Sequence, residues 1–312
     1  MLQPEPPSVA PPQDWPLLWQ AMLHARTAPL HAPGPGGWLA ASHPGAWRLT
    51  PTCSAASAAL FEVYQPLLDA RLAQARAPAA DPVRPWALAQ LGQSLDGCVA
   101  TAAGDSYFVT GPQSLVHLHR LRALSDAVLV GAGTVAVDDP LLTTRHVPGP
   151  HPVRVLLDPA ARLDGGARVL RDAAAPTLWL CDSRHANAAR DRLPAGSAAE
   201  VLAVEGLLDA AEPARGPDLA RAFSALAGRG LRVLLVEGGG VTVSRCLAAG
   251  VLDRLHLVIA PVIIGAGRRG LQHPGPPRMA DCARPAARRL VLGEDVLWDL
   301  DLRSATSAAA GV

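Results

Sequence analysis

The sequence predicts an α/β domain with a mixed, mostly parallel sheet, helices on both faces and an antiparallel C-terminal edge. Apolar runs of strand length recur after the first quarter of the chain, helical stretches separate several of them, and the last two runs surround a turn. Because these runs do not alternate with polar residues, we expect both faces of the sheet to be covered. The predicted strands are Trp86–Leu91, Ala127–Val130, Val153–Leu157, Thr177–Cys181, Glu200–Val204, Leu231–Val236 and Arg254–Ala260.

Helices are expected between these strands, at Pro112–Ala123, Pro217–Gly228 and Val241–Ala249. Pro112 suits a first helical turn, and Thr110 is the expected cap of that helix. Near the C-terminus, residues 288–302 form two short apolar runs around Gly293–Asp295, a pattern typical of a β-hairpin. The sheet should therefore end in antiparallel strands.

The first part of the chain has a different texture. Residues 1–12 are rich in proline and are expected to be disordered, residues 14–25 should form a short helix capped by Asp14, and residues 55–77 should form a longer helix that Pro66 kinks or splits. A further proline-rich stretch at 77–85 reads as a linker. We therefore expect an N-terminal extension of unknown role (1–82), one domain (83–303) and a flexible tail (304–312).

Composition excludes several classes of function. The 28 basic and 27 acidic residues give a net charge of +1 without a polybasic run, so nucleic acid is not an expected partner. No stretch of about 18 uncharged apolar residues appears, so no membrane span is predicted. The early acid in MLQPEPPSVAPPQDW argues against a secretory signal, and the five cysteines, none in a CxxC pair, suggest free thiols in the cytoplasm.

Two glycine-rich segments follow predicted strands. In VLVGAGTV (128–135), the glycines would let the backbone approach a ligand and offer amides to a phosphate, although plain tight turns share this pattern. In LLVEGGGVTVS (234–244), a strand, an acid, three glycines and a helix start follow in order, and helix N-termini bind anions. Glu237 should stand at the carboxyl end of its strand, where ligands bind, unless it is a solvated carboxylate or the partner of an arginine.

The helix from Pro112 carries a charged residue on its apolar face. Leu115, Leu118 and Arg122 share this face by their spacing, and a buried arginine needs a carboxylate or a phosphate unless it reaches the rim. His117 and His119 are two residues apart, face different sides of the helix and are interpreted as surface residues rather than metal ligands.

Polar residues also cluster in two turns. Asp138-Asp139-Pro140 predicts a turn, which could frame a pocket with Arg145 aimed at an anionic group. Residues 104–108 place Ser106 beside aromatic side chains that could pack on a nicotinamide or pyrimidine ring or belong to the core. Other sites are excluded: the chain contains no HxE with a later PCxxC, no P-loop, no GxSxG and no complete GxGxxG, so a zinc deaminase is not expected.

In order along the chain, several motifs resemble the reductase domain of the riboflavin-biosynthesis pyrimidine deaminase-reductases, which has a fold similar to dihydrofolate reductase. These motifs are LGQSLDG (91–97), GDSYFVTGP (104–112), HRLRALSDAVLVGAGTVAVDDPLLTTR (119–145), PVRVLLD (152–158), LLVEGGG (234–240) and LHLVIAPVIIGAG (255–267). The resemblance covers about residues 84–303, without a deaminase domain. It implies an NADPH-dependent reduction of the ribosyl side chain of 5-amino-6-(5-phosphoribosylamino)uracil to a ribityl chain.

The resemblance also implies roles for matching residues and a homodimer. The small phosphorylated pyrimidine substrate would contact Ser106, Arg122, Leu142, Arg145 and Glu237, and Glu237 is the candidate catalytic residue. The cofactor would contact Gly92, Phe108, Thr134, Asp138, Gly239, Gly240, Val241, Thr242, Val243, Ser244 and Arg245.

Three positions depart from the family pattern. Gln90 stands where many members have lysine, Pro159 where a serine near the adenosine end is common, and Phe108 where tryptophan is common. Pro159 offers neither a hydroxyl nor an amide, so NADH is not excluded as the cofactor. Two alternatives stay open: a paralogous NAD(P)H reductase acting on another pterin-like or nucleotide-like substrate, and a non-catalytic nucleotide-binding module.

Overall fold

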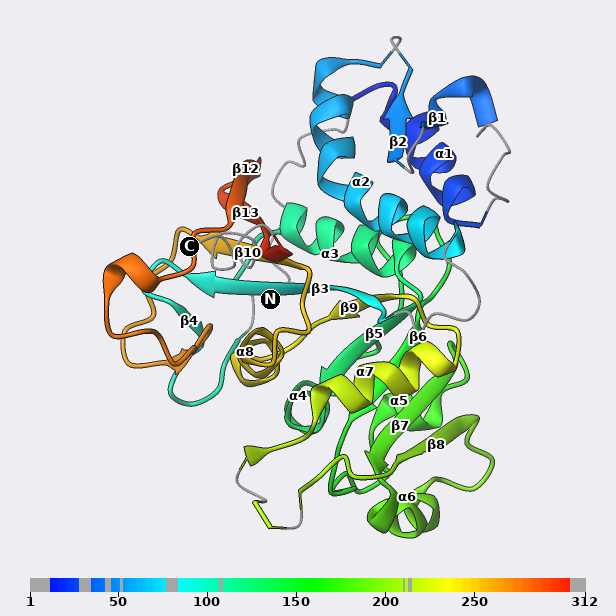
Figure 1. Ribbon diagram of the computed structural model, residues 1–312, viewed down its shortest axis with the longest axis vertical. Helices are drawn as coiled ribbons and strands as arrows, with labels where there is room; N and C mark the ends of the chain where they lie inside the picture. Colours follow the sequence, from blue (N-terminus) through cyan, green and yellow to red (C-terminus); the bar gives the residue numbers. More distant parts are fainter. Residues whose placement is uncertain are drawn as a thin grey trace, which may run out of the picture.

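The structure, a computed structural model, describes residues 12–27, 35–42, 46–50, 53–76, 84–106, 109–209, 211–212 and 215–303. Its central sheet has nine strands in the order β12-β13-β10-β3-β9-β5-β6-β7-β8 (Figure 1). These strands are β3 (Trp86–Ser94), β5 (Ala127–Gly131), β6 (Val153–Leu157), β7 (Thr177–Asp182), β8 (Ala199–Val204), β9 (Val233–Val236), β10 (Arg254–Ala260), β12 (Ala286–Leu292) and β13 (Asp295–Asp301).

The predicted fold class is confirmed. From β10 to β8 every neighbouring pair of strands is parallel, whereas β13 runs antiparallel to both β10 and β12. The hairpin of β12 and β13 is the predicted antiparallel C-terminal edge. Two short two-stranded sheets complete the strands: β1 (Leu39–Ser42) with β2 (Ala46–Leu49), and β4 (Cys98–Ala100) with β11 (Arg268–Arg269).

Helices cover both faces of the sheet. They are α1 (Trp15–Thr27), α2 (Ala55–Arg76), α3 (Pro112–Leu124), α4 (Ala132–Asp138), α5 (Arg168–Arg171), α6 (Ala186–Arg192), α7 (Leu219–Gly228) and α8 (Gly240–Ala248), with the 3₁₀ turns η1 (Pro35–Gly37), η2 (Ser183–His185) and η4 (Met279–Asp281). Within the described residues, no helix is both long and apolar enough to cross a membrane.

Alternate residues of the central strands enter two separate hydrophobic cores, as a sheet buried on both faces requires. In β3, Leu88 belongs to the core on the side of α1, α2 and α3, and Ala87 to the core on the side of α7 and α8. Phe223 of α7 is fully buried in the second core. The continuous apolar runs of the sequence follow from this arrangement.

The N-terminal extension packs on the outer side of α3, so that α3 lies between the extension and the sheet (Figure 1). Trp19 of α1 donates from its indole nitrogen to the Pro148 carbonyl at 2.9 Å. Arg71 of α2 forms an ion pair with Asp126 at 2.7 Å. The proposed boundary at 82/83 and the tail 304–312 lie outside the described residues, as do all but the last of residues 1–12, which were expected to be disordered.

Pro66, predicted to kink or split this helix, does not split α2. The helix runs through it from residue 55 to residue 76 as one element. Proline removes the amide that would donate to the carbonyl four residues earlier, at Glu62. Arg288 of β12 supplies the missing donor, because its Nη2 lies 2.7 Å from the Glu62 carbonyl oxygen. A distant side chain therefore replaces the local hydrogen bond.

Three local predictions for α3 were wrong. The N-cap is Gly111, not Thr110, and Asp295 accepts hydrogen bonds from the Gly111 amide (2.7 Å) and the Ser114 hydroxyl (2.6 Å). Leu115, expected on the buried face, is 39% exposed. His117 and His119, expected at the surface, are fully buried, His117 against Tyr64 of α2 and His119 against the Arg145–His146 segment.

A chain of buried polar groups connects the extension to the sheet through α3. The Tyr64 hydroxyl lies 2.8 Å from His117 Nδ1, and His117 Nε2 lies 3.0 Å from His256 Nδ1. His256 Nε2 is 3.2 Å from Asp299 Oδ1, an ion-pair contact rather than a well-aligned hydrogen bond. Arg288 contacts both Asp299 (3.1 Å) and Glu62 (3.1 Å), so this series of polar contacts leads back to α2. We call Tyr64, His117, His256 and Asp299 the polar relay.

Candidate functional site

The candidate site begins where β9 ends and α8 starts. Glu237 follows the last residue of β9, and its amide donates to the Leu129 carbonyl of β5 at 2.9 Å. Gly238 has φ +110°, a conformation that favours glycine, and Gly239 is the N-cap of α8. The strand thus turns sharply into a helix at the carboxyl edge of the sheet, as the sequence predicted.

Arg122 and Glu237 form a buried, two-pronged ion pair. Arg122 Nε lies 2.8 Å from Glu237 Oε1, and Nη2 lies 2.6 Å from Oε2. Their side chains are only 7% and 6% exposed. The arginine predicted on the apolar face of α3 has therefore found a carboxylate, in the geometry for which the planar guanidinium is suited.

Arg145 supplies a second guanidinium near this pair. Its Nη1 donates to Thr143 Oγ1 at 2.9 Å, and Arg122 Nη1 donates to the Thr143 carbonyl at 3.1 Å. No carboxylate among the described residues forms an ion pair with Arg145, whose side chain is exposed. Burial, Arg122 and Arg168 lower the pKa of Arg145, whereas Glu237 raises it. The site thus has one neutralised and one available cation.

The turn before Arg145 is strained in a way the sequence did not indicate. Asp139 has φ +40° and Leu142 has φ +56°, and Leu142 is buried. A bulky residue rarely adopts this left-handed conformation, and such strain concentrates at functional sites. The turn predicted from Asp138-Asp139-Pro140 is instead the end of α4, because Asp138 is the last residue of the helix and Asp139 is its left-handed C-cap. The chain then leads to Thr143 and Arg145.

On the other side of Glu237, α4 and α8 meet. Thr134 Oγ1 accepts a hydrogen bond from the Gly239 amide at 3.2 Å, and a Cβ on Gly131 would come within 2.5 Å of Thr242 Oγ1. Gly131, expected in a tight turn, is the N-cap of α4. Burial raises the pKa of Asp138, an effect that Arg268 opposes.

The remaining residues predicted to contact the cofactor occupy varied positions. In α8, Gly240 is buried, Val241 is 61% exposed, Val243 is fully buried in the second core, the Ser244 hydroxyl accepts from the Gln272 amide at 2.8 Å, and Arg245 packs beside Gly216. In β3, Gly92 lies against Thr110, where a Cβ would collide with the threonine methyl group. Ser106 is exposed, and Phe108 lies outside the described residues.

Gln90 lies beside this site. In the sheet it pairs with His256 of β10, and the register of β3 with β9 places it next to Glu237. Its side chain is on the same face of β3 as Leu88, under α3, and the residue is 8% exposed. The departure from lysine therefore places a neutral amide between the polar relay and the Arg122–Glu237 pair.

Comparison with known proteins identifies the family. The sequence profile of the RibD C-terminal domain matches residues 85–291. The chain belongs to this family. A 2,5-diamino-6-ribosylamino-4(3H)-pyrimidinone 5′-phosphate reductase from Methanothermobacter thermautotrophicus is 34% identical, over 71% of this chain and 100% of that protein. The riboflavin biosynthesis protein RibD of Aquifex aeolicus is 35% identical, over 59% of this chain and 48% of that protein.

Solved structures support the fold of this RibD-type domain. RibD from Acinetobacter baumannii (form 2) has a TM-score of 0.60 at 24% identity, covering 75% of this chain and 62% of that chain. The chain therefore spans about half of the Aquifex RibD protein and the full length of the archaeal reductase. The extension of α1 and α2 precedes the region that the family profile matches.

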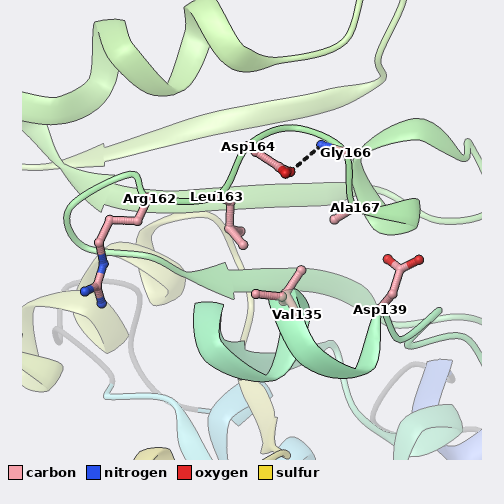
Figure 2. Close-up of a pocket in the computed structure, with 8 residues that line it drawn as sticks. Val135, Asp139, Arg162, Leu163, Asp164, Gly166 and Ala167 are labelled. Atoms are coloured by element: carbon pink, nitrogen blue, oxygen red, sulfur yellow. Dashed lines mark hydrogen bonds between the residues drawn. The ribbon is translucent and has the colours of Figure 1, made fainter.

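The RibD-type domain has a hollow of about 350 Å³ beside α4. Figure 2 shows Val135 of α4 and Asp139, the C-cap of this helix, facing the loop that follows β6, with Leu163 opposite Val135. The hollow is lined by Val135, Ala136, Asp139, Arg162, Leu163, Asp164, Gly166 and Ala167. Buried Asp158 holds this loop, since its Oδ2 accepts from the Leu163 amide at 2.8 Å and from Trp179 Nε1 at 3.2 Å.

Arg162, Asp164 and His119 were not recognised from the sequence as candidate site residues. The first two follow a predicted strand at its carboxyl end, a position that could have been recognised as part of a ligand-binding edge. His119 stands three residues before Arg122, a spacing that places both side chains on neighbouring positions of one helix face. These missed residues all border the segments that carry the predicted site.

Proposed function

We propose that this chain is an NADPH-dependent reductase of the riboflavin pathway that reduces the ribosyl side chain of 5-amino-6-(5-phosphoribosylamino)uracil to a ribityl chain. One observation carries the proposal: the buried Arg122–Glu237 pair and the available Arg145 converge on Thr143, next to the glycine-rich start of α8. The names of the relatives, a pyrimidine phosphate reductase and RibD, support it. By resemblance to the family we also expect a cytoplasmic homodimer.

The substrate side would use the cations and the fixed carboxylate. Arg145 would bind the 5′-phosphate through charge-assisted hydrogen bonds, since no carboxylate of the described residues competes for it. Arg122 would hold Glu237 in place, and each carboxylate oxygen keeps a lone pair that could accept from a sugar hydroxyl. Ser106 and Leu142 would complete the contacts with the pyrimidine and ribose.

The cofactor side offers a suitable surface for a dinucleotide. The first amides of α8 have no partners within the helix, and the dipole of the helix favours a phosphate there. Thr134 stands beside these amides. The hollow by α4, lined by both apolar and charged residues, has the size of a nucleoside subsite. Bound NADPH would supply the hydride that reduces C1′ of the substrate.

The chain's own contribution would be positioning. Holding two reactants at the right distance can lower a barrier by about 7–11 kcal/mol. The rigid Arg122–Glu237 pair would orient the open-chain sugar, and Arg145 would hold its phosphate end. The strained turn at Asp139 and Leu142 would fix the direction from which Arg145 enters the site.

The archaeal relative supports a second substrate. Its name specifies a 2,5-diaminopyrimidinone, which differs from the uracil derivative by an amino group in place of the oxygen at C2. Both compounds carry the same ribosylamino group and phosphate, so Arg145 and Glu237 would serve either one. The distinction therefore concerns the pyrimidine end of the site.

The function is tested by incubating the purified chain with each pyrimidine phosphate and with NADPH or NADH, while following the nicotinamide absorbance band. We expect oxidation of NADPH with at least one of the two substrates. Cofactor binding without turnover would transfer support to a reductase of another pterin-like or nucleotide-like substrate, or to a non-catalytic module. Absence of cofactor binding would reject the dinucleotide site altogether.

Arg162 is the residue of the hollow that could recognise a 2′-phosphate, because Pro159 cannot donate to one. Arg162→Ala should raise the KM for NADPH about tenfold, the effect of losing about 1.4 kcal/mol of a charge-assisted contact. The KM for NADH should stay within about twofold by the same energy scale. Arg171→Ala, an exposed arginine outside the hollow, is the control. An equal rise in KM for NADPH and NADH would show that Arg162 does not recognise the 2′-phosphate.

A further inference from the structure

His119 is a fully buried polar residue that the proposed chemistry does not use. Its Nδ1 accepts a hydrogen bond from the backbone amide of Arg145 at 2.9 Å. Its Nε2 is buried without a hydrogen-bond partner among the described residues. The ring packs edge-on against His146, with centroids 4.5 Å apart and planes at 80°. The side chain is therefore held in one orientation, directed at the segment that carries Arg145.

His119 and Arg122 together hold the backbone of this segment. They are three residues apart on α3 and so project from neighbouring positions. Arg122 donates to the Thr143 carbonyl at 3.1 Å, and His119 accepts from the Arg145 amide. One helix thus fixes the carbonyl of Thr143 and the amide of Arg145, the two groups that flank Thr144 in the strained turn region.

The imidazole must be neutral for this contact. Burial, and then the neighbouring charges of Arg122, His146 and Arg145, lower the pKa of His119 to about 3. Because Nδ1 accepts the amide hydrogen, the ring proton resides on Nε2. A neutral ring adds an acceptor beside two guanidinium groups without adding a third positive charge. A lysine or arginine at this position would do the opposite.

We propose that His119 is a positioning residue for the substrate's phosphate: it fixes the backbone of Arg145 so that the guanidinium stands ready at the phosphate position. The inference rests on the proposed function, in which Arg145 binds that phosphate. A histidine that only fills the core does not require a hydrogen bond to this particular amide, 26 residues away along the chain. His119 itself does not need to touch the substrate.

The test compares substitutions that keep or remove the acceptor. In His119→Asn the carboxamide oxygen can occupy the place of Nδ1, in His119→Gln it falls near Nε2, and His119→Leu has no acceptor. His119→Leu and His119→Gln should raise the KM for the phosphorylated substrate about tenfold, as expected for about 1.4 kcal/mol, with KM for NADPH unchanged. His119→Asn should stay near the original enzyme.

The phosphate provides a readout that a merely structural role would not affect. Turnover of the substrate lacking its 5′-phosphate should be nearly equal in all four proteins. The double variant His119→Leu/Arg145→Ala should be no worse than Arg145→Ala alone, since one residue acts through the other. Equal losses with both substrates, or an asparagine variant as poor as the leucine variant, would overturn the proposal.

A separate measurement distinguishes this inference from the function on which it rests. Binding of ribose 5-phosphate, measured by calorimetry, needs no turnover. If the unaltered chain reduces neither pyrimidine, the proposed function fails, but weaker ribose 5-phosphate binding by His119→Leu than by His119→Asn still supports positioning. Equal binding by these two variants contradicts it. If the leucine variant does not fold, the glutamine and asparagine variants give the same comparison.

Discussion

Replacement of Arg122 by leucine is expected to destabilise the protein by about 3–5 kcal/mol, because it leaves the buried Glu237 carboxylate without its partner. Both Glu237 oxygens depend on Arg122, through contacts of 2.8 and 2.6 Å. The same change should reduce turnover by at least about a hundredfold, or about 2.7 kcal/mol, since it also frees the carboxylate that would orient the sugar. Urea unfolding and steady-state kinetics measure the two effects.

Three further variants show whether the pair acts as a unit. Arg122→Leu/Glu237→Leu removes both charges and should recover most of the lost stability but none of the activity, because a buried ion pair adds little net stability over apolar packing. Arg122→Lys keeps the charge without the two-pronged geometry, so its stability and activity should lie between those of the original protein and those of Arg122→Leu. Arg278→Leu, which breaks the exposed pair with Asp281, should cost less than about 1 kcal/mol. Additive losses in the double variant would contradict this account.

The sequence predicted the sheet because its evidence is local. Seven apolar runs marked the parallel strands, and the turn around Gly293 marked the hairpin, since a strand buried on both faces has to be apolar along its length. The errors arose where the deciding partner is remote. The capping of α3 by Asp295 joins residues 181 or more apart, and the donor that replaces the Pro66 amide lies 226 residues from the Glu62 carbonyl it serves. No local pattern contains these contacts.

The same reasoning explains the mixed outcome for the site. Arg122 could be recognised because a charge on an apolar helix face needs a partner, and the candidate carboxylate stood at the end of a strand. His117 and His119 were misread as surface residues because the sequence shows neither that α2 packs on His117 nor that the Arg145–His146 segment packs on His119. Leu115 was misassigned for a related reason: the helix is buried on two sides, and this residue lies on neither.

Acid should loosen the protein through the polar relay. Burial is the main cause that lowers the pKa of both His117 and His256, which are fully buried and lie 3.0 Å apart. Both rings accept at Nδ1 if Tyr64 donates to His117, His117 donates to His256, and His256 faces the Asp299 carboxylate. With all hydrogen bonds running in this order, each acceptor of the polar relay faces a donor. The order requires both histidines to be neutral. A proton added to Nδ1 of either ring would turn this acceptor into a donor, so that two donors would face each other.

The sign of the pH effect follows from these lowered pKa values. Below the ordinary histidine pKa of 6.5, the unfolded chain binds more protons than the folded chain. The free energy of unfolding therefore falls as the pH falls. Each histidine that stays neutral in the folded chain costs at most about 1.4 kcal/mol of folding free energy per pH unit below 6.5. Asp299 affects stability at lower pH. Burial raises its pKa, but His256 and Arg254 lower the pKa more, so the stability that Asp299 contributes is lost only below the ordinary value of 3.8.

Urea unfolding followed by tryptophan fluorescence from about pH 7.5 to about pH 5 measures this slope, since Trp15 and Trp19 lie in the extension that the relay joins to the sheet. His117→Gln/His256→Gln keeps amide hydrogen bonds without titrating in this range. It should be less stable near neutral pH but show a much flatter slope below pH 6.5, the ordinary histidine pKa. His273→Gln, at an exposed position, should retain the full slope. An unchanged slope in the double variant would mean that other groups take up the protons, and the two buried rings would then hold the extension in place without making it sensitive to acid.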